Sequence, residues 1–255
     1  MNLFFHSYGT SGTPLIILHG LLGSSDNWHT LGKMFGARFH VFTLDARNHG
    51  RSPHTDEMSY PAMADDVREF MQQHGLQTAH LLGHSMGGKT AMQLALTHSD
   101  LVDKLVVVDI APRAYDRQHD YIFDAITSLN LSGMSSRQEI SAAFSDTIPS
   151  ETTRQFVMKN LARDDSGAFS WKLNLDTILR HYAEINSALD SAKRFEKPTL
   201  FVKSNKAGYI TQEDEPSIKQ MFPQAQIVGL DVGHWIHAEA PEEFARIVLD
   251  FLLKE

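Results

Sequence analysis

The sequence contains no cysteine among its 255 residues. This absence excludes a disulfide framework, a zinc ribbon and a cysteine nucleophile. Basic residues are also in the minority, since 23 lysines and arginines face 31 aspartates and glutamates and leave a formal net charge of −8. Because counterion release from nucleic-acid phosphates needs a basic face, this balance argues against nucleic-acid binding. We therefore expect no nucleic-acid partner.

Long apolar runs are missing as well. The first nine residues hold no lysine or arginine, and the first apolar run, Leu15–Leu18, is much too short for a signal peptide or a membrane span. Hydrophobic residues make up 42% of the chain and charged residues only 21%, a balance that argues against disorder. We expect a soluble, cytoplasmic, globular protein with no membrane partner.

Short apolar runs alternate with helical patterns along much of the chain. This alternation is typical of an α/β protein with a mostly parallel central sheet flanked by helices. The nearly continuous apolar character of the runs is expected of strands buried on both faces. The clearest helix begins near Pro241, with Phe244, Val248 and Phe251 on one stripe. The predicted strands are Pro14–Leu18, Phe39–Leu44, Ala79–Gly83, Lys104–Asp109, Thr199–Lys203 and Gln226–Leu230.

The alternation stops between Ala111 and Pro198. The intervening segment has helical spacing and a capping-box pattern from Ser136 to Glu139, and it has no long apolar strand run. We interpret residues 112–197 as a mostly helical insertion, and residues 1–111 and 198–255 as the core domain. The alternative is that the segment simply continues the same domain.

The strongest chemical signal is Gly83-His84-Ser85-Met86-Gly87, which follows a predicted strand and opens a predicted helix. A serine on such a sharp turn takes a strained backbone, and small neighbours let the chain fold so tightly. The turn exposes the hydroxyl at the carboxyl end of the sheet. It also directs the amide of Met86 and the helix N-terminus toward an oxyanion formed beside the serine. Ser85 is therefore the predicted nucleophile.

A serine needs a base to remove its proton, and His234 is the best placed of the 14 histidines. It follows the last predicted strand, so it lies at the edge of the sheet where Ser85 is expected. A metal site built on His234 and His237 lacks a third ligand at sensible spacing. We therefore expect no metal and no cofactor.

The acid that orients the imidazole is less narrowly defined. Asp109 ends a run of three valines, where a carboxylate must be paired to offset its desolvation. Many proteins of this architecture carry the acid after the strand that here is Thr199–Lys203, but no carboxylate follows until Glu213 and Asp214. The candidates are thus Asp109, Glu213, Asp214 and Asp231. The order Ser85, Asp109, His234 is the usual Ser–Asp–His order of this class.

A second oxyanion donor is expected from the loop after an early strand. The run His19–Gly23 fits, since the backbone amide of Leu21 can face that of Met86 across the site. The alternative is a glycine turn that merely connects strand to helix. Trp28 and Trp235 flank this loop and His234, so we predict that both bind substrate.

Together these motifs resemble those of the α/β-hydrolase superfamily, in its order and over essentially the whole chain. The pattern rests on His19-Gly20, the run Asp45–Ser52, the Gly83–Gly87 elbow and Gly233-His234. The runs Arg47–Gly50, Gly83–Lys89 and Asp109–Pro112 are similar to those of the small bacterial esterases of the YbfF type.

This resemblance implies an α/β-hydrolase fold with a helical lid at residues 112–197. In that group the acid follows the strand that precedes the lid, so the resemblance implies Asp109. The missing carboxylate after Lys203 departs from the commoner superfamily pattern.

These features predict a serine carboxylesterase that hydrolyses short- to medium-chain acyl esters, with a small acyl ester or thioester as its binding partner. The same site could serve an acyl-CoA thioesterase, a carbon–carbon bond hydrolase or a peroxyacid-forming enzyme. A non-catalytic ligand-binding protein on the same fold is the alternative from a different class. Four basic residues could contact an acidic substrate or CoA phosphates, although we expect them to be solvated surface charges: Lys89, Arg113, Arg117 and Lys206.

Overall fold

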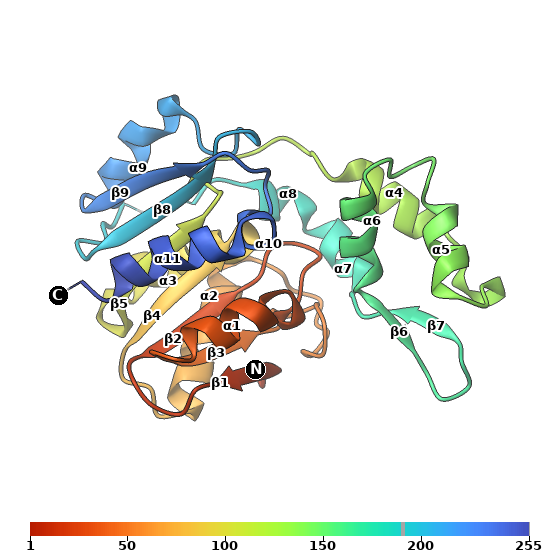
Figure 1. Cartoon of the computed structure of the whole chain (residues 1–255), viewed down its shortest axis with the longest axis horizontal. Helices are drawn as coiled ribbons and strands as arrows, with labels where there is room; N and C mark the ends of the chain where they lie inside the picture. Colours follow the sequence, from red (N-terminus) through yellow and green to blue (C-terminus); the bar gives the residue numbers. More distant parts are fainter. Residues whose placement is uncertain (190–191, 255) are drawn as a thin grey trace.

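The computed structural model describes residues 1–189 and 192–254, and within them seven strands form one sheet in the order β1-β3-β2-β4-β5-β8-β9. All neighbouring pairs are parallel except β1 with β3, which are antiparallel. The protein therefore has the predicted α/β architecture with a mostly parallel sheet (Figure 1). The strands are β1 (Phe5–Tyr8), β2 (Pro14–Leu18), β3 (His40–Leu44), β4 (Ala79–His84), β5 (Val102–Val108), β8 (Thr199–Ser204) and β9 (Ala225–Leu230).

Two apolar cores cover the two faces of the sheet. Side chains at alternate positions of a strand point to opposite faces, so Leu15 and Ile17 join one core while Ile16 joins the other. Helices α1, α10 and α11 complete the first core, and α2, α3 and α9 pack in the second. These helices are α1 (His29–Phe35), α2 (Tyr60–Gln73), α3 (Met86–Thr97), α9 (Glu215–Met221), α10 (Ile236–Glu239) and α11 (Pro241–Leu252).

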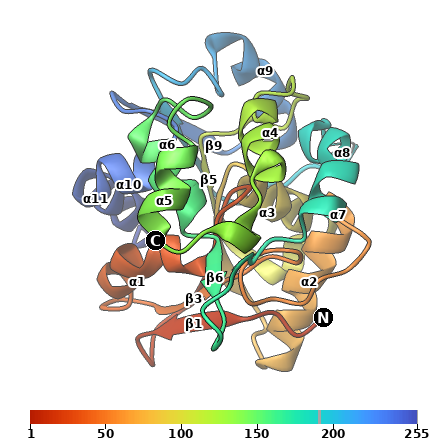
Figure 2. The same cartoon turned by 90° about the vertical axis from the view of Figure 1, so that its right-hand side faces the viewer.

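The segment between β5 and β8 forms a separate group of helices beyond one end of the sheet (Figures 1 and 2). Within the part of the chain that the structure describes, it holds five α-helices, a short 3-10 helix at Leu131–Gly133 and a two-stranded hairpin. At its capping box, the Ser136 hydroxyl accepts from the Glu139 amide, but the Glu139 carboxylate binds Ser135. The elements are α4 (Asp120–Ser128), α5 (Arg137–Ala143), α6 (Glu151–Met158), β6 (Leu161–Arg163), β7 (Phe169–Trp171), α7 (Leu175–Arg180) and α8 (Tyr182–Asn186).

This segment is attached to the core by hydrogen bonds to loops at the carboxyl ends of the strands. The Asn160 amide group donates to the Leu22 carbonyl in the loop after β2. Asn174 donates to Asn48 and Thr55 in the loop after β3. The inserted segment therefore lies over the edge of the sheet where Ser85 is expected.

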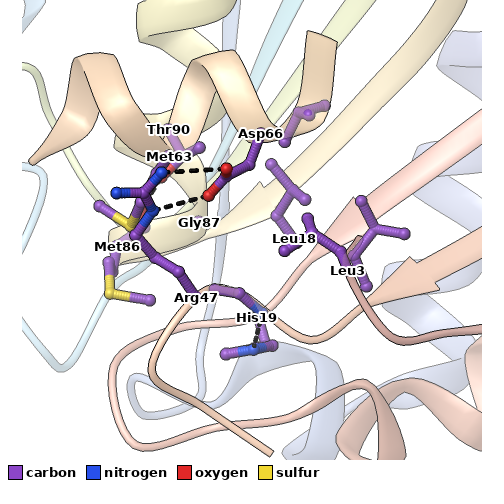
Figure 3. Close-up of a pocket in the computed structure, with 12 residues that line it drawn as sticks. Leu3, Leu18, His19, Arg47, Met63, Asp66, Met86, Gly87 and Thr90 are labelled. Carbon is purple, nitrogen blue, oxygen red and sulfur yellow. Dashed lines mark hydrogen bonds and ion pairs between the residues drawn. The ribbon is translucent and has the colours of Figure 1, made fainter. Parts of the chain in front are cut away.

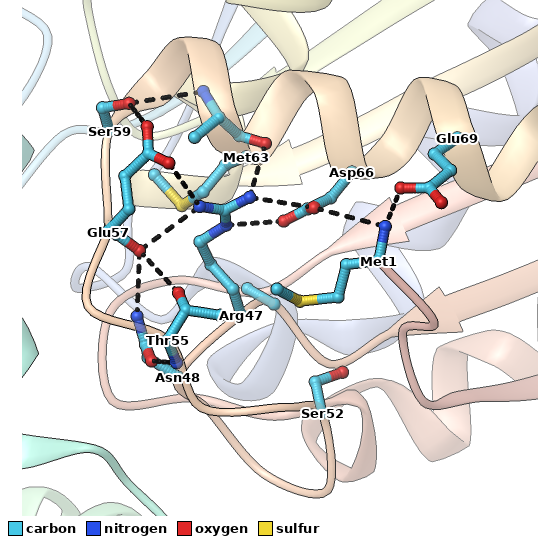
Figure 4. A network of polar contacts seen from close by, with 12 residues as sticks. Met1, Arg47, Asn48, Ser52, Thr55, Glu57, Ser59, Met63, Asp66 and Glu69 are labelled. Atoms are coloured by element: carbon cyan, nitrogen blue, oxygen red, sulfur yellow. Dashed lines mark hydrogen bonds and ion pairs between the residues drawn. The ribbon is translucent and has the colours of Figure 1, made fainter.

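The loop after β3, which carries the Asp45–Ser52 motif, is joined to α2 by a buried ion pair (Figure 4). Arg47 donates from Nε and Nη2 to the two carboxylate oxygens of Asp66 on α2, at 2.7 and 2.9 Å. Both side chains are buried, and a bidentate pair of this kind fixes orientation as well as distance. The motif that carries part of the family resemblance is thus a structural anchor.

Candidate active site

Ser85 lies at a sharp turn between β4 and α3. Its backbone has φ 53° and ψ −118°, a region that costs a non-glycine residue about 1–3 kcal/mol. The amide of Ser85 donates to the Val108 carbonyl on the neighbouring strand, which fixes the turn to the sheet. A side chain at Gly87 would overlap the carbonyls of Leu18 and His19, so only glycine fits there. The sequence pattern around Ser85 is therefore explained by the geometry of the turn.

Asp109 occupies the equivalent position on the next strand, at the end of β5. It also has a positive φ, of 50°, and its side chain is fully buried. One carboxylate oxygen accepts the amide N–H of Ser204 at 2.8 Å, and the other lies 2.8 Å from Nδ1 of His234. The structure thus brings Asp109 and His234 together from sequence positions 125 residues apart.

The three other candidate acids lie in different surroundings. Asp214 forms an ion pair with Arg113 and accepts hydrogen bonds from Thr211. Asp231 is exposed and accepts from Asn205 at 2.6 Å, and Glu213 is also exposed. Asp109 is therefore the carboxylate that the structure pairs with His234.

Burial controls the charge of this pair. It raises the pKa of the Asp109 carboxyl to about 7, a shift that the Ser204 amide opposes. Burial also lowers the pKa of His234 to about 3. The imidazole is therefore a neutral group at neutral pH, with the proton on Nδ1 facing Asp109 and Nε2 free to accept another.

Three residues that the sequence analysis did not assign to the site support the Asp109–His234 pair. Tyr209 stacks on the imidazole, with ring centroids 4.0 Å apart, and Ser204 holds Asp109. Ser204 ends β8 and Tyr209 lies in the loop that follows it, where many proteins of this architecture carry the acid. The Nε2 atom of His84 lies 3.0 Å from the carbonyl oxygen of His234. An aromatic ring and a backbone amide have no sequence signature, so this support could not be predicted.

The loop after β2 faces Ser85. A side chain on Gly20 would lie 3.3 Å from Cβ of Ser85, which shows how closely the loop approaches the elbow. Leu21 lines one pocket together with Ser85 and Met86. Met86 is the first residue of α3, so its N–H has no acceptor within the helix. The structure therefore places Leu21 and Met86, the residues predicted to donate to an oxyanion, beside Ser85.

Lys89 lies in the same pocket, and the expectation of a solvated surface charge is wrong for it. It is only 1% exposed, and its Nζ donates to the carbonyls of Arg113 and Ser187 at 2.8 and 2.5 Å. Burial lowers the pKa of this amine to about 7. A lysine one turn after Ser85 points inward, which charge counting along the sequence does not reveal.

The two tryptophans predicted to bind substrate have different positions. Trp28 is fully buried in the core, where its ring stacks on His237 at 4.4 Å, so it does not reach the pocket surface. Trp235 lines an open groove of about 400 Å³ between α6 and α10, with its ring 5.3 Å from that of Phe156. Only Trp235 is therefore placed where a ligand can touch it.

A second cavity lies behind the elbow, lined by Met86 and Gly87 together with Arg47, Asp66 and His19 (Figure 3). Ser85 is not among the residues that line this cavity, so the cavity is distinct from the pocket that contains Ser85. In residues 1–189 and 192–254, no group of three or more potential ligands is arranged to hold a metal ion. Within the same residues, no helix has the length and apolar character needed to cross a membrane.

A model of the alpha/beta hydrolase fold matches residues 13–241 of the sequence. The chain belongs to the alpha/beta hydrolase family. This α/β-hydrolase is 38% identical to the sn-1-specific diacylglycerol lipase ABHD11 of Mus musculus, over 96% of this chain and 82% of that protein. It is 33% identical to the esterase YbfF of Escherichia coli, over 95% of this chain and 94% of the other. A solved structure of a marine microorganism esterase, 42% identical, superimposes with a TM-score of 0.96 and covers 98% of each chain.

Proposed function

We propose that this α/β-hydrolase is a serine carboxylesterase that cleaves short- to medium-chain acyl esters through an acyl-enzyme. The observation that carries the proposal is the 2.8 Å contact between His234 Nδ1 and Asp109 Oδ2, at the sheet edge that also carries Ser85 on its strained turn. Relatives named as an esterase and as a lipase support the same class of reaction.

In the proposed mechanism, Ser85 Oγ attacks the ester carbonyl carbon while its proton moves to Nε2 of His234. The Asp109 carboxylate stabilises the imidazolium that results. The carbonyl oxygen takes the electron pair and accepts hydrogen bonds from the amides of Leu21 and Met86. When the carbon–oxygen bond to the alcohol breaks, the imidazolium returns the proton to the leaving group.

Water then attacks the acyl-Ser85 ester, again with its proton passing to His234, and the carboxylic acid leaves as Ser85 regains its proton. The reaction uses water as its second substrate and needs no cofactor. In this proposal residues 112–197 form the lid over the site. The pocket that contains Ser85 offers an apolar wall for the ester, made of Leu21, Tyr60, Ile110 and Ile185. Trp235 and Phe156 line a separate groove that does not include Ser85.

The test is turnover of a chain-length series of p-nitrophenyl esters by the wild type and by Ser85→Ala. We expect Ser85→Ala to remain folded and to lose at least a thousandfold in turnover, the scale seen when members of such triads are removed. The acyl length that is turned over fastest indicates the length of the acyl-binding pocket. Wild-type turnover in Ser85→Ala would reject the mechanism, and binding without turnover in the wild type would favour the ligand-binding alternative.

A further inference from the structure

The inserted segment forms a hydrogen bond to the loop after β2, which contains Leu21. Asn160, between α6 and β6, is 2% exposed and donates through Nδ2 to the Leu22 carbonyl at 2.7 Å. Its own backbone is fixed within the insertion, because its N–H donates to Val157 and its carbonyl accepts from Lys172. The side chain is thus a rigid link from the insertion to the loop after β2.

The peptide unit between Leu22 and Gly23 is hydrogen-bonded through both its C=O and its N–H. Asn160 donates to the C=O of Leu22. In the same unit, the N–H of Gly23 donates to the Gly20 carbonyl at 2.9 Å. The Gly20 carbonyl in turn shares a peptide unit with the Leu21 N–H. Because a trans peptide is planar and its C=O and N–H point in opposite directions, fixing the Gly20 carbonyl fixes the direction of the Leu21 N–H. One line of hydrogen bonds therefore runs from Asn160 to the predicted oxyanion donor.

The turn needs this support because it is strained. Leu22 has φ 59°, a left-handed conformation that a leucine rarely adopts. Two neutral histidines brace the turn from the core side. The Nε2 of His49 accepts the Leu22 N–H at 3.2 Å, and Nδ1 of His19 lies 2.8 Å from the Gly20 carbonyl oxygen. From the insertion, Asn160 is the contact that reaches the Leu22 carbonyl.

We infer that Asn160 is a positioning residue, which couples docking of the insertion to formation of the oxyanion hole. It acts through two peptide units and touches neither substrate nor nucleophile. The inference rests on the proposed serine-hydrolase function. Hydrogen bonds in such a line polarise one another, so the Leu21 N–H is both aimed and strengthened when Asn160 is in place.

The matched variants are Asn160→Asp and Asn174→Asp. The first replaces the donor facing the Leu22 carbonyl with a carboxylate of the same shape. The second keeps the side-chain oxygen that caps α7 but loses the donors to Asn48 and Thr55, so it weakens a different contact between insertion and core. Asn160→Ala is a second variant without the added charge.

Turnover is measured per active site, titrated with a phosphonate ester that reacts with Ser85, together with inhibition by an alkyl trifluoromethyl ketone. The ketone forms a hemiketal whose oxyanion occupies the hole. Removal of a whole oxyanion donor costs about 10²–10³ in kcat, so a misdirected one should cost about ten- to a hundredfold. We expect this loss in kcat for the Asn160 variants, with KM within about threefold, and a matching loss of ketone affinity.

Equal losses in the Asn174 variant would show that docking of the insertion in general is responsible, and would overturn the inference. Unchanged kcat per titrated site in both Asn160 variants would overturn it as well. Wild-type and Ser85→Ala turnover on the same esters tests the proposed function separately, so a failure of one does not conceal the state of the other.

Discussion

Ser85 and Asp109 follow neighbouring strands and share a positive φ, although neither is glycine. In each case the left-handed backbone turns the side chain away from the strand direction at the carboxyl edge of the sheet. Strain of this kind persists where surrounding contacts hold it, here the hydrogen bonds to Val108 and Ser204. The backbone thus presents a hydroxyl and a carboxylate at one edge, and His234 completes the group from the loop after β9.

We predict that Asp109→Asn lowers turnover of a p-nitrophenyl ester about ten-thousandfold while the protein remains folded. An asparagine amide can donate to the imidazole, and it then stabilises the tautomer whose Nε2 carries the proton and cannot act as a base. The measurement is kcat/KM for the wild type and the variant. The matched control is Asp231→Asn, which changes an exposed carboxylate near the same histidine. A large loss in the control, with little in Asp109→Asn, would move the acid to Asp231.

At the scale of elements, buried strands were predictable because burial on both faces requires continuous apolar runs. The predicted strands match β2, β3, β4, β5, β8 and β9 within two residues at each end. Strand β1 escaped prediction because Phe5–Tyr8 is a short edge strand of mixed polarity. The inward turn of Lys89 and the burial of Trp28 depend on tertiary packing, which leaves no periodic pattern in the sequence. The same holds for Asn160, a single polar residue in an inserted segment.

Helix α3 connects Ser85 to both ends of the insertion. The Lys89 amine binds the carbonyls of Arg113 and Ser187, which lie before the first helix and after the last helix of the inserted segment. The two ends also bind each other, through the Tyr115 amide and the Asn186 carbonyl at 2.8 Å. The insertion is therefore anchored at its base to the helix that begins directly after Ser85.

We predict that Lys89→Met loosens the insertion. Two partly buried carbonyls lose their hydrogen-bond donor, which costs about 1–3 kcal/mol of unfolding free energy. The expected result is faster proteolytic cleavage within residues 112–197 than elsewhere, read from fragment masses during limited digestion. Lys104→Met is the control, since Lys104 binds carbonyls of Phe251 and Leu252 at the end of α11. The same cleavage pattern in both variants would show a general loss of stability instead.

Across the whole molecule, many histidines are buried as neutral groups. Among the described residues, burial lowers the pKa of His49 to about 3 and of His80 to about 4, and it lowers those of His19, His84 and His237 as well. Several of them hold the active-site loops in their neutral form. The Nε2 of His49 accepts the Leu22 amide, and that of His19 accepts the Ala46 amide. Protonation would remove these acceptors.

We predict that the protein loses stability steeply as the pH falls below about 6.5, where histidines of the unfolded chain become protonated. The folded state binds these protons only near pH 3–4. Between about pH 4 and 6.5, each such histidine therefore adds up to about 1.4 kcal/mol per pH unit to the slope of the unfolding free energy against pH. Asp109 works in the opposite direction, because its raised pKa lets the folded state take up a proton between about pH 4 and 7. The measurement is the free energy of unfolding in guanidinium between pH 7.5 and 4.5.

One histidine can be separated from the rest. His80 lies in β4, away from the site, with its ring against Phe39 and its Nδ1 without a partner among the described residues. His80→Phe keeps an aromatic ring at this position but removes the titrating group. The slope of the unfolding free energy against pH should therefore fall by the contribution of one histidine. His54→Gln, which replaces an exposed histidine, is the control. If both variants keep the wild-type slope, the acid sensitivity comes from other groups, and the neutral burial of His80 does not contribute to it.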